Sequence, residues 1–126
     1  EMTALRDNNC ITIEQYGDIK CVRREEVTQK DIDLAGKGLM MALDAMLSGQ
    51  YDIVVLDEIN VAIWFDLLSV KQVTDFLDKR PENVEVILTG RRAPKELIEC
   101  ADLVSEVKEV KHYYNRGIPA RNGIER

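Results

Sequence analysis

The stretch Ile53-Val54-Val55-Leu56-Asp57-Glu58 decides the fold class of this chain. Its four apolar residues, three of them β-branched, predict a short strand buried on both faces, as in a parallel sheet covered by helices. Two carboxylates follow at the carboxyl end of the strand, which is the edge where open α/β sheets bind ligands. Two interpretations stay open: a site for a divalent metal that carries a nucleotide triphosphate, or two solvated acids in a loop.

The composition bounds the class of protein. The chain has 126 residues, of which 45% are hydrophobic and 32% are charged, so we expect one globular domain. Its net charge of −6 argues against a general nucleic-acid binder, which needs a basic face. No stretch approaches the roughly 20 apolar residues of a membrane helix, and no signal peptide is evident. Cys10, Cys21 and Cys100 have no metal-ligand spacing, which favours reduced thiols in a cytoplasmic protein.

Strand and helix patterns alternate along the chain. Helix-start signals are Thr28 with Asp31 and Ser69 with Gln72, both of the capping-box type, and Pro94 at a first turn. Gly49 and Pro81 end the first two helices. The apolar faces of these helices are Ile32, Ala35, Leu39, Leu43 and Met46, then Val70, Val73, Phe76 and Leu77. We expect strands at 11–15, 53–56, 84–88 and 103–107, which together predict a parallel α/β sheet with right-handed crossovers.

Polar residues follow two of these strands. Asp57 and Glu58 end one strand, and Thr89-Gly90-Arg91 ends another, so the parallel arrangement should bring both sets to one edge. Carboxylates, an arginine and a glycine that permits close approach suit a complex of metal and triphosphate. No Gly-rich phosphate loop ending in Lys-Ser/Thr occurs. Gly36-Lys37-Gly38 is a poor substitute, because its backbone N–H groups lie inside a predicted helix.

Five short segments occur in an order that points to a family. They are LDEINVA (56–62), LTGRRAP (88–94), ADLVSE (101–106), KHYY (111–114) and GIPARNGIE (117–125). Together they resemble the ATP:corrinoid adenosyltransferases of the P-loop type, and the resemblance covers nearly the whole chain. It implies transfer of the 5′-deoxyadenosyl group of ATP to the Co(I) centre of cobalamin or a corrinoid precursor, with release of triphosphate. The cofactors and partners implied are Mg²⁺, a second copy of the chain in a homodimer, and an electron-donating flavoprotein reductase.

The resemblance also implies a fold and a set of site residues. The fold is a recombinase-like P-loop domain, with helices on both faces of a six-stranded parallel sheet, of which residues 1–126 would be the C-terminal portion. Glu58 matches the metal-associated acid of the family and would be catalytic, with Asp57 beside it. Arg91, with Thr89 and Gly90, matches positions close to the nucleotide.

The chain departs from the family pattern in two places. The phosphate loop, the first helix and the second strand of the family precede Glu1, so we expect an N-terminally incomplete fold. This chain alone should therefore bind MgATP weakly and be inactive. The corrinoid-facing loop of some members carries aromatic residues, and the matching stretch here offers only Tyr16, Ile19 and Val22.

The tail, 111–126, carries an excess of basic residues and two glycines. It would be a lid that brings Arg121 to the phosphates, or a fixed or solvated extension. His112, Tyr113 and Tyr114 suit a ligand contact and a packed turn about equally. Trp64 and Phe65 suit a corrinoid platform less well than core or dimer contacts.

The residue inventory favours a reaction that is driven by positioning. Co(I) is itself a strong nucleophile, and His112 is the single histidine, so no Ser/His/Asp or Cys/His arrangement is evident. Two other functions stay open. In part of another P-loop ATPase, Glu58 would polarise water for hydrolysis. A non-catalytic relative would bind a corrinoid, a nucleotide or a partner.

Overall fold

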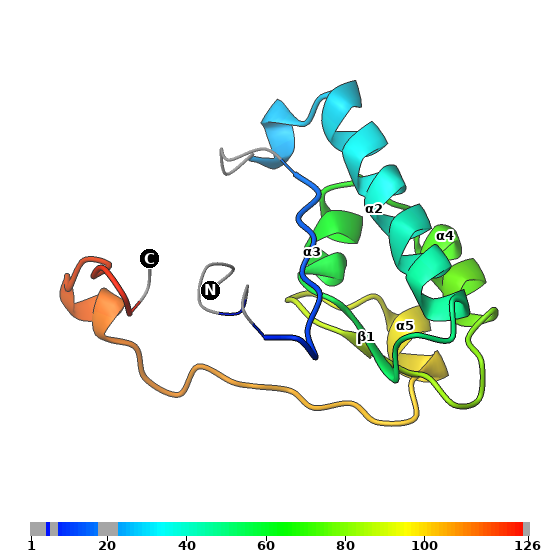
Figure 1. The fold of residues 1–126 in the computed structure, drawn as a ribbon. Helices are drawn as coiled ribbons and strands as arrows, with labels where there is room; N and C mark the ends of the chain where they lie inside the picture. Colours follow the sequence, from blue (N-terminus) through cyan, green and yellow to red (C-terminus); the bar gives the residue numbers. More distant parts are fainter. Residues whose placement is uncertain (1–4, 6–7, 18–22, 125–126) are drawn as a thin grey trace.

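The computed structural model describes residues 5, 8–17 and 23–124, and Figure 1 shows their arrangement. The predicted corrinoid-facing residues Ile19 and Val22 lie outside this part of the chain. The elements in chain order are η1 (Arg24–Glu26), α2 (Gln29–Leu47), β1 (Ile53–Leu56), α3 (Ile59–Trp64), α4 (Val70–Leu77), β2 (Glu85–Leu88), α5 (Lys95–Cys100) and η2 (Tyr113–Arg116).

The sheet confirms the prediction of a parallel α/β arrangement. Within the described residues it has two strands, β1 and β2, which run parallel with Val54 opposite Val86 and Leu56 opposite Leu88. Because the last residues of the two strands, Leu56 and Leu88, lie opposite each other, both strands end at the same edge of the sheet. The chain then passes from β1 directly into α3. The residues that follow Leu56 and Leu88 are thereby brought together.

The long helix α2 begins and ends where the sequence predicts. The Asp31 carboxylate accepts hydrogen bonds from the backbone N–H of Thr28 at 2.8 Å and from the Thr28 hydroxyl at 2.6 Å. These hydrogen bonds hold the pKa of Asp31 below its ordinary value of 3.8. Gly49 follows the helix with φ of 72°, a conformation that glycine adopts without strain.

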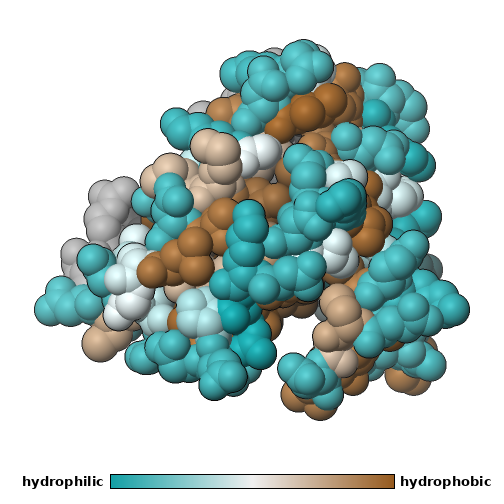
Figure 2. Space-filling view, turned by 90° about the vertical axis from the view of Figure 1, so that its right-hand side faces the viewer, coloured by the Kyte–Doolittle hydropathy of each residue, from teal (hydrophilic) through white to brown (hydrophobic). Residues whose placement is uncertain are grey.

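The sheet has one covered and one open face, so the prediction of a run buried on both faces is wrong for the described chain. Val54 is buried, whereas Ile53 and Val55 are 55% and 53% exposed, and Ile87 on β2 is 46% exposed. Apolar side chains such as Met40 and Met41 of α2 also reach the surface. Figure 2 shows such apolar patches among hydrophilic atoms. Among the helices of the described residues, none combines the length and the apolar character that a membrane-spanning helix needs.

Two segments predicted as strands are not strands. Residues 11–15 are extended but unpaired with the sheet, and the segment is held by a hydrogen bond of 3.2 Å from the Tyr51 hydroxyl to Thr12 Oγ1. Residues 103–107 leave the body as an exposed extended segment, in which Leu103 is 86% and Val107 is 97% exposed. Apolar–polar alternation specifies a strand only where a neighbouring strand completes the hydrogen bonds. Neither segment has such a neighbour among the described residues.

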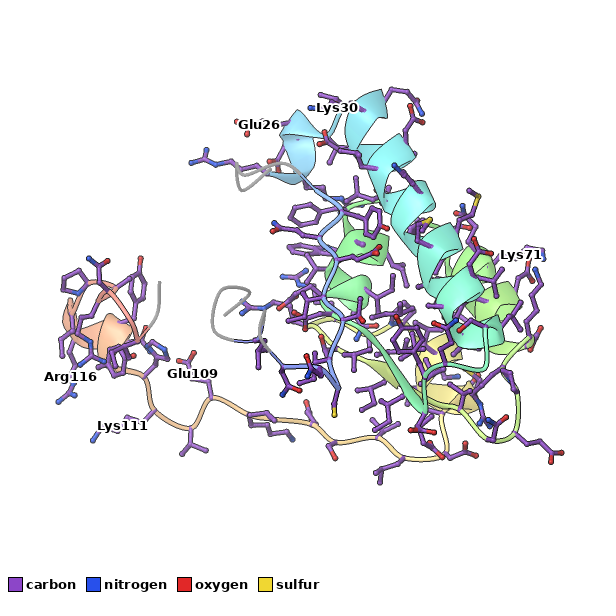
Figure 3. All side chains as sticks on the ribbon, viewed as in Figure 1. Glu26, Lys30, Lys71, Glu109, Lys111 and Arg116 are labelled. Carbon is purple, nitrogen blue, oxygen red and sulfur yellow. The ribbon has the colours of Figure 1, made fainter. Side chains whose placement is uncertain are left out.

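The tail stands apart from the body. In Figure 3, the labelled side chains of Glu109, Lys111 and Arg116 lie well away from the helices and the sheet. Within the tail, η2 is followed by Gly117, whose φ of 78° ends the short helix. The predicted packed turn is therefore present around His112, whose ring nitrogen Nδ1 accepts a hydrogen bond from the Tyr114 backbone N–H at 3.0 Å.

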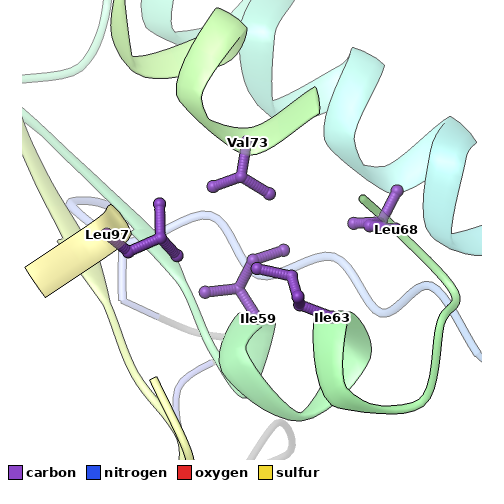
Figure 4. Packing of buried hydrophobic residues seen from close by; sticks show 5 residues of the cluster. All are labelled: Ile59, Ile63, Leu68, Val73 and Leu97. Atoms are coloured by element: carbon purple, nitrogen blue, oxygen red, sulfur yellow. The ribbon is translucent and has the colours of Figure 1, made fainter. Parts of the chain in front are cut away.

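The core lies between the covered face of the sheet and the helices. One apolar cluster joins Ile59 and Ile63 of α3 to residues of the following segments, as Figure 4 shows; the others are Leu68, Val73 and Leu97. A second cluster contains Met46, Val54, Phe76 and Val84. Three of these residues, Met46, Val73 and Phe76, belong to the predicted inner faces of α2 and α4. The helix α3 itself was not predicted, and it places the start of its first turn directly at the sheet edge.

Candidate functional site

Thr89 connects the two strand ends at the carboxyl edge of the sheet. Its hydroxyl donates a hydrogen bond to Asp57 Oδ1 at 2.6 Å and accepts one from the backbone N–H of Glu58 at 2.8 Å. Its own backbone N–H donates to the carbonyl of Leu56 at 3.2 Å, which continues the sheet ladder. One side chain therefore holds the Asp57 carboxylate and the Glu58 backbone, and the predicted convergence of Asp57, Glu58 and Thr89 is confirmed.

Glu58 occupies a strained backbone conformation. Its φ of 57° and ψ of 22° lie in the left-handed region, which is uncommon for a residue other than glycine. The turn that results lets the Glu58 carbonyl accept hydrogen bonds from the N–H groups of Val61 and Ala62, both at 3.0 Å. Glu58 is thus the residue at which the strand becomes a helix, with its carboxylate at the sheet edge. Such strain is frequent at functional sites.

The missing side chain of Gly90 leaves space for the Glu58 carboxylate. The φ of Gly90 is 117°, and a Cβ atom built there would lie 3.3 Å from Glu58 Oε2 and 3.1 Å from Asn60 Cβ. The backbone N–H of Asn60 also donates to the Thr89 carbonyl at 3.2 Å. The groups that approach Gly90 in this structure are protein side chains, and the close approach of a metal–triphosphate complex to this glycine stays a prediction.

The two arginines after Gly90 lie in different surroundings. Arg91 is exposed at the strand end. Arg92 has a φ of 63°, and its guanidinium carbon lies 3.9 Å from the centre of the Trp64 ring, a cation–π contact. Trp64 in turn meets Phe65 edge to face at 5.1 Å. The aromatic pair thereby supports the turn that carries the two arginines, a role that the sequence did not suggest.

Tyr16 packs against Gly38 of α2 and not against Asp57 or Glu58. A Cβ built on Gly38 would lie 2.9 Å from both Cβ and Cγ of Tyr16, so the glycine makes room for the tyrosine ring. The Tyr16 hydroxyl donates to the Glu14 carboxylate, and this hydrogen bond raises the pKa of Tyr16. The contact gives Gly38 a packing role.

Arg121 is not brought to the acids. Its guanidinium carbon lies 4.9 Å from the centre of the Tyr113 ring, within the tail, and the tail stands apart from the sheet edge in Figure 1. Its assignment to the nucleotide site stays a prediction.

The donor set of the site suits a hard cation that brings ligands of its own. No group of three or more His, Cys, Asp or Glu side chains within the described residues could hold a metal ion by itself. Asp57 and Glu58 supply carboxylate oxygens at one edge, and magnesium is usually bound through one or two carboxylates, with waters and substrate phosphates completing its shell. The residues present therefore fit a magnesium–nucleotide complex better than a metal held by protein alone.

Comparisons with known proteins show the family of this chain. A family model described as ATP:corrinoid adenosyltransferase BtuR/CobO/CobP matches residues 1–126. A corrinoid adenosyltransferase of Sinorhizobium sp is 39% identical over 97 residues, which cover 76% of this chain and 45% of that protein. The corrinoid adenosyltransferase of Escherichia coli K12 is 39% identical over 74 residues, which cover 59% of this chain and 38% of that protein.

An uncharacterized protein of Nostoc, all2391, is 47% identical over 88 residues, which cover 70% of this chain and 23% of that protein. The chain thus spans less than half the length of these curated relatives.

Proposed function

The chain belongs to the ATP:corrinoid adenosyltransferase family, and from this premise we propose that the protein transfers the 5′-deoxyadenosyl group of ATP to a Co(I) corrinoid. The corrinoid is cobalamin or one of its precursors, and triphosphate is released. The observation that carries the proposal is the cluster in which Thr89 fixes Asp57 and Glu58 at the ligand-binding edge of the sheet. This cluster lies within two of the segments that carry the family resemblance, 56–62 and 88–94.

The reaction needs positioning more than proton transfer. The cobalt electron pair forms a bond to C5′ of ATP, the C5′–O bond breaks, and its electron pair leaves with the triphosphate, so Co(I) becomes Co(III). The nucleophile needs no base and the leaving group needs no proton. The described site fits this requirement, because Thr89 holds the Asp57 carboxylate and the Glu58 backbone in place at the sheet edge.

Each residue of the cluster has a role in this proposal. Glu58 and Asp57 would hold Mg²⁺, which when bound neutralises charge on the triphosphate. The Thr89 hydroxyl orients the Asp57 carboxylate and fixes the Glu58 backbone before the nucleotide arrives. Arg91, next to Gly90, would stabilise the charge that collects on the leaving group.

We extend the proposal to the complete fold and its partners. A recombinase-like P-loop fold, with helices on both faces of a larger parallel sheet, would cover Ile53, Val55 and Ile87, whose exposure supports it. The family resemblance supports a homodimer and an electron-donating flavoprotein reductase. The free thiols of Cys10 and Cys100 suit the cytoplasm, a reducing compartment.

The tail is proposed to act as a lid over the bound nucleotide. Gly117 and Gly123, with φ of 78° and 77°, provide bends on either side of Arg121. Closure would exclude water, which matters because protons and oxidants quench Co(I). Hydrogen exchange of residues 111–124 should slow when MgATP and corrinoid bind; identical exchange in both states would leave the tail a fixed element.

Product analysis tests the reaction. The full-length protein is mixed with MgATP and a chemically reduced Co(I) corrinoid, and the products are separated. We expect adenosylated corrinoid and triphosphate in equal amounts. ADP and phosphate would instead identify an ATPase in which Glu58 activates water. Bound corrinoid or nucleotide with no product would identify a non-catalytic relative. Reactions without reductant provide the control.

A further inference from the structure

Asn60 is a buried polar residue at the carboxyl edge of the sheet. It is the second residue of α3 and is 6% exposed. Among the described residues, no other polar or charged residue is buried. Its sequence neighbour Ile59 and its helix neighbour Ile63 belong to the apolar cluster of Figure 4.

The Asn60 side-chain oxygen lacks a donor. Oδ1 is buried and accepts no hydrogen bond from the described part of the chain. A buried acceptor without a donor lowers stability, and most native proteins avoid it. An exception of this kind next to candidate metal ligands indicates that the donor arrives with a ligand.

The geometry places Asn60 beside Glu58. The point where a Gly90 side chain would begin lies 3.1 Å from Asn60 Cβ and 3.3 Å from Glu58 Oε2. The Asn60 backbone N–H is fixed to the Thr89 carbonyl at 3.2 Å, so the residue cannot leave the site without breaking the turn. Asn60 Cβ and the Glu58 carboxylate therefore border the same space, which the missing side chain of Gly90 leaves free.

We propose that Asn60 is a ligand-binding residue whose Oδ1 accepts a hydrogen bond from an O–H donor of the metal–nucleotide complex. The inference rests on the proposed function, and it deepens it by naming a residue outside the acid pair. The donor is a ribose hydroxyl or a water in the metal shell. Because Oδ1 is buried in this structure, a group that covers it must move when the donor binds.

The test compares two variants of the full-length protein with a control. Asn60→Leu removes the acceptor, Asn60→Asp keeps an acceptor oxygen, and Asn83→Leu makes the same change at an exposed position. Calorimetry measures MgATP affinity, and urea denaturation measures the stability of the free protein. We expect Asn60→Leu to weaken MgATP binding roughly fivefold to tenfold while stability stays equal or rises. Asn60→Asp and Asn83→Leu should bind MgATP within about twofold of the wild type.

Two further titrations identify the donor. If it is a ribose hydroxyl, the difference between wild type and Asn60→Leu disappears with 2′-deoxy-ATP or 3′-deoxy-ATP. If it is a metal-bound water, the difference persists with both, and Asn60→Leu also weakens the binding of Mn²⁺ alone. Unchanged MgATP affinity in Asn60→Leu overturns the inference, as does a loss that persists with both deoxynucleotides while Mn²⁺ binding is unaffected. Failure of the wild type to bind MgATP would overturn the proposed function as well, which separates the two failures.

Discussion

Replacing Gly90 by alanine should destabilise the protein by about 2–4 kcal/mol. The backbone contribution comes from a φ of 117°, where a residue with a side chain costs about 1–3 kcal/mol. The steric contribution comes from contacts of 3.1 Å to Asn60 Cβ and 3.3 Å to Glu58 Oε2, and crowding a packed site costs about 1 kcal/mol or more. Because small domains are stable by only about 5–15 kcal/mol, the loss should be obvious in urea denaturation.

The same substitution at Gly36 is a matched control, for which we expect a change in unfolding free energy of the opposite sign. Gly36 lies inside α2, and nothing lies within 4 Å of its missing Cβ. Gly36→Ala should therefore raise the unfolding free energy by about 0.5–1 kcal/mol, because alanine restricts the unfolded chain and favours the helix. If both variants moved the urea midpoint in the same direction, or if Gly90→Ala were neutral, the described turn at Gly90 would be wrong.

Three other changes test neighbouring features. Thr89→Val removes a hydroxyl that makes hydrogen bonds of 2.6 and 2.8 Å, so it should lower the unfolding free energy by about 1–3 kcal/mol. Thr89→Ser keeps the hydroxyl and should retain most of this stability. Equal losses of stability in the two variants, measured by chemical denaturation, would contradict a stabilising role of the hydroxyl. The pKa of Asp31 is lowered in the folded protein, so its capping contribution is present above pH 3.8 and is lost as the pH falls through the folded value. The stability difference between wild type and Asp31→Asn should therefore shrink between pH 7 and pH 3, and a constant difference would contradict the cap. Gly38→Ala should push Tyr16 away, since the new Cβ would lie 2.9 Å from Tyr16 Cβ, and hydrogen exchange of residues 11–17 should rise in this variant but not in Gly36→Ala.

The parts of the fold that depend on local chemistry were predictable. The capping residues of α2 and α4 specify where these helices begin, because each capping box joins residues within one helical turn. The convergence of Asp57 with Thr89 followed from parallel topology alone.

The parts that depend on distant partners were not predictable. Residues 103–107 alternate like a strand, yet a strand needs a neighbour, which the described chain does not provide. The sequence did not predict helix α3, because this helix begins at Glu58, which is in the left-handed conformation and matches no capping pattern. Asn60 offered one signal, an amide between Ile59 and Val61, but its burial is a property of the packed structure.

The rate of adenosyl transfer by Glu58→Gln tests the central claim most directly. The substitution keeps the shape of the side chain and removes the charge proposed to hold the metal, while the backbone hydrogen bond from Glu58 to Thr89 is retained. In the full-length protein, we expect the transfer rate at saturating corrinoid to fall by about 100-fold or more, with an unchanged urea midpoint. A Glu58→Gln protein that transfers the adenosyl group at the wild-type rate would contradict the assignment of the strand-end acids as the catalytic site.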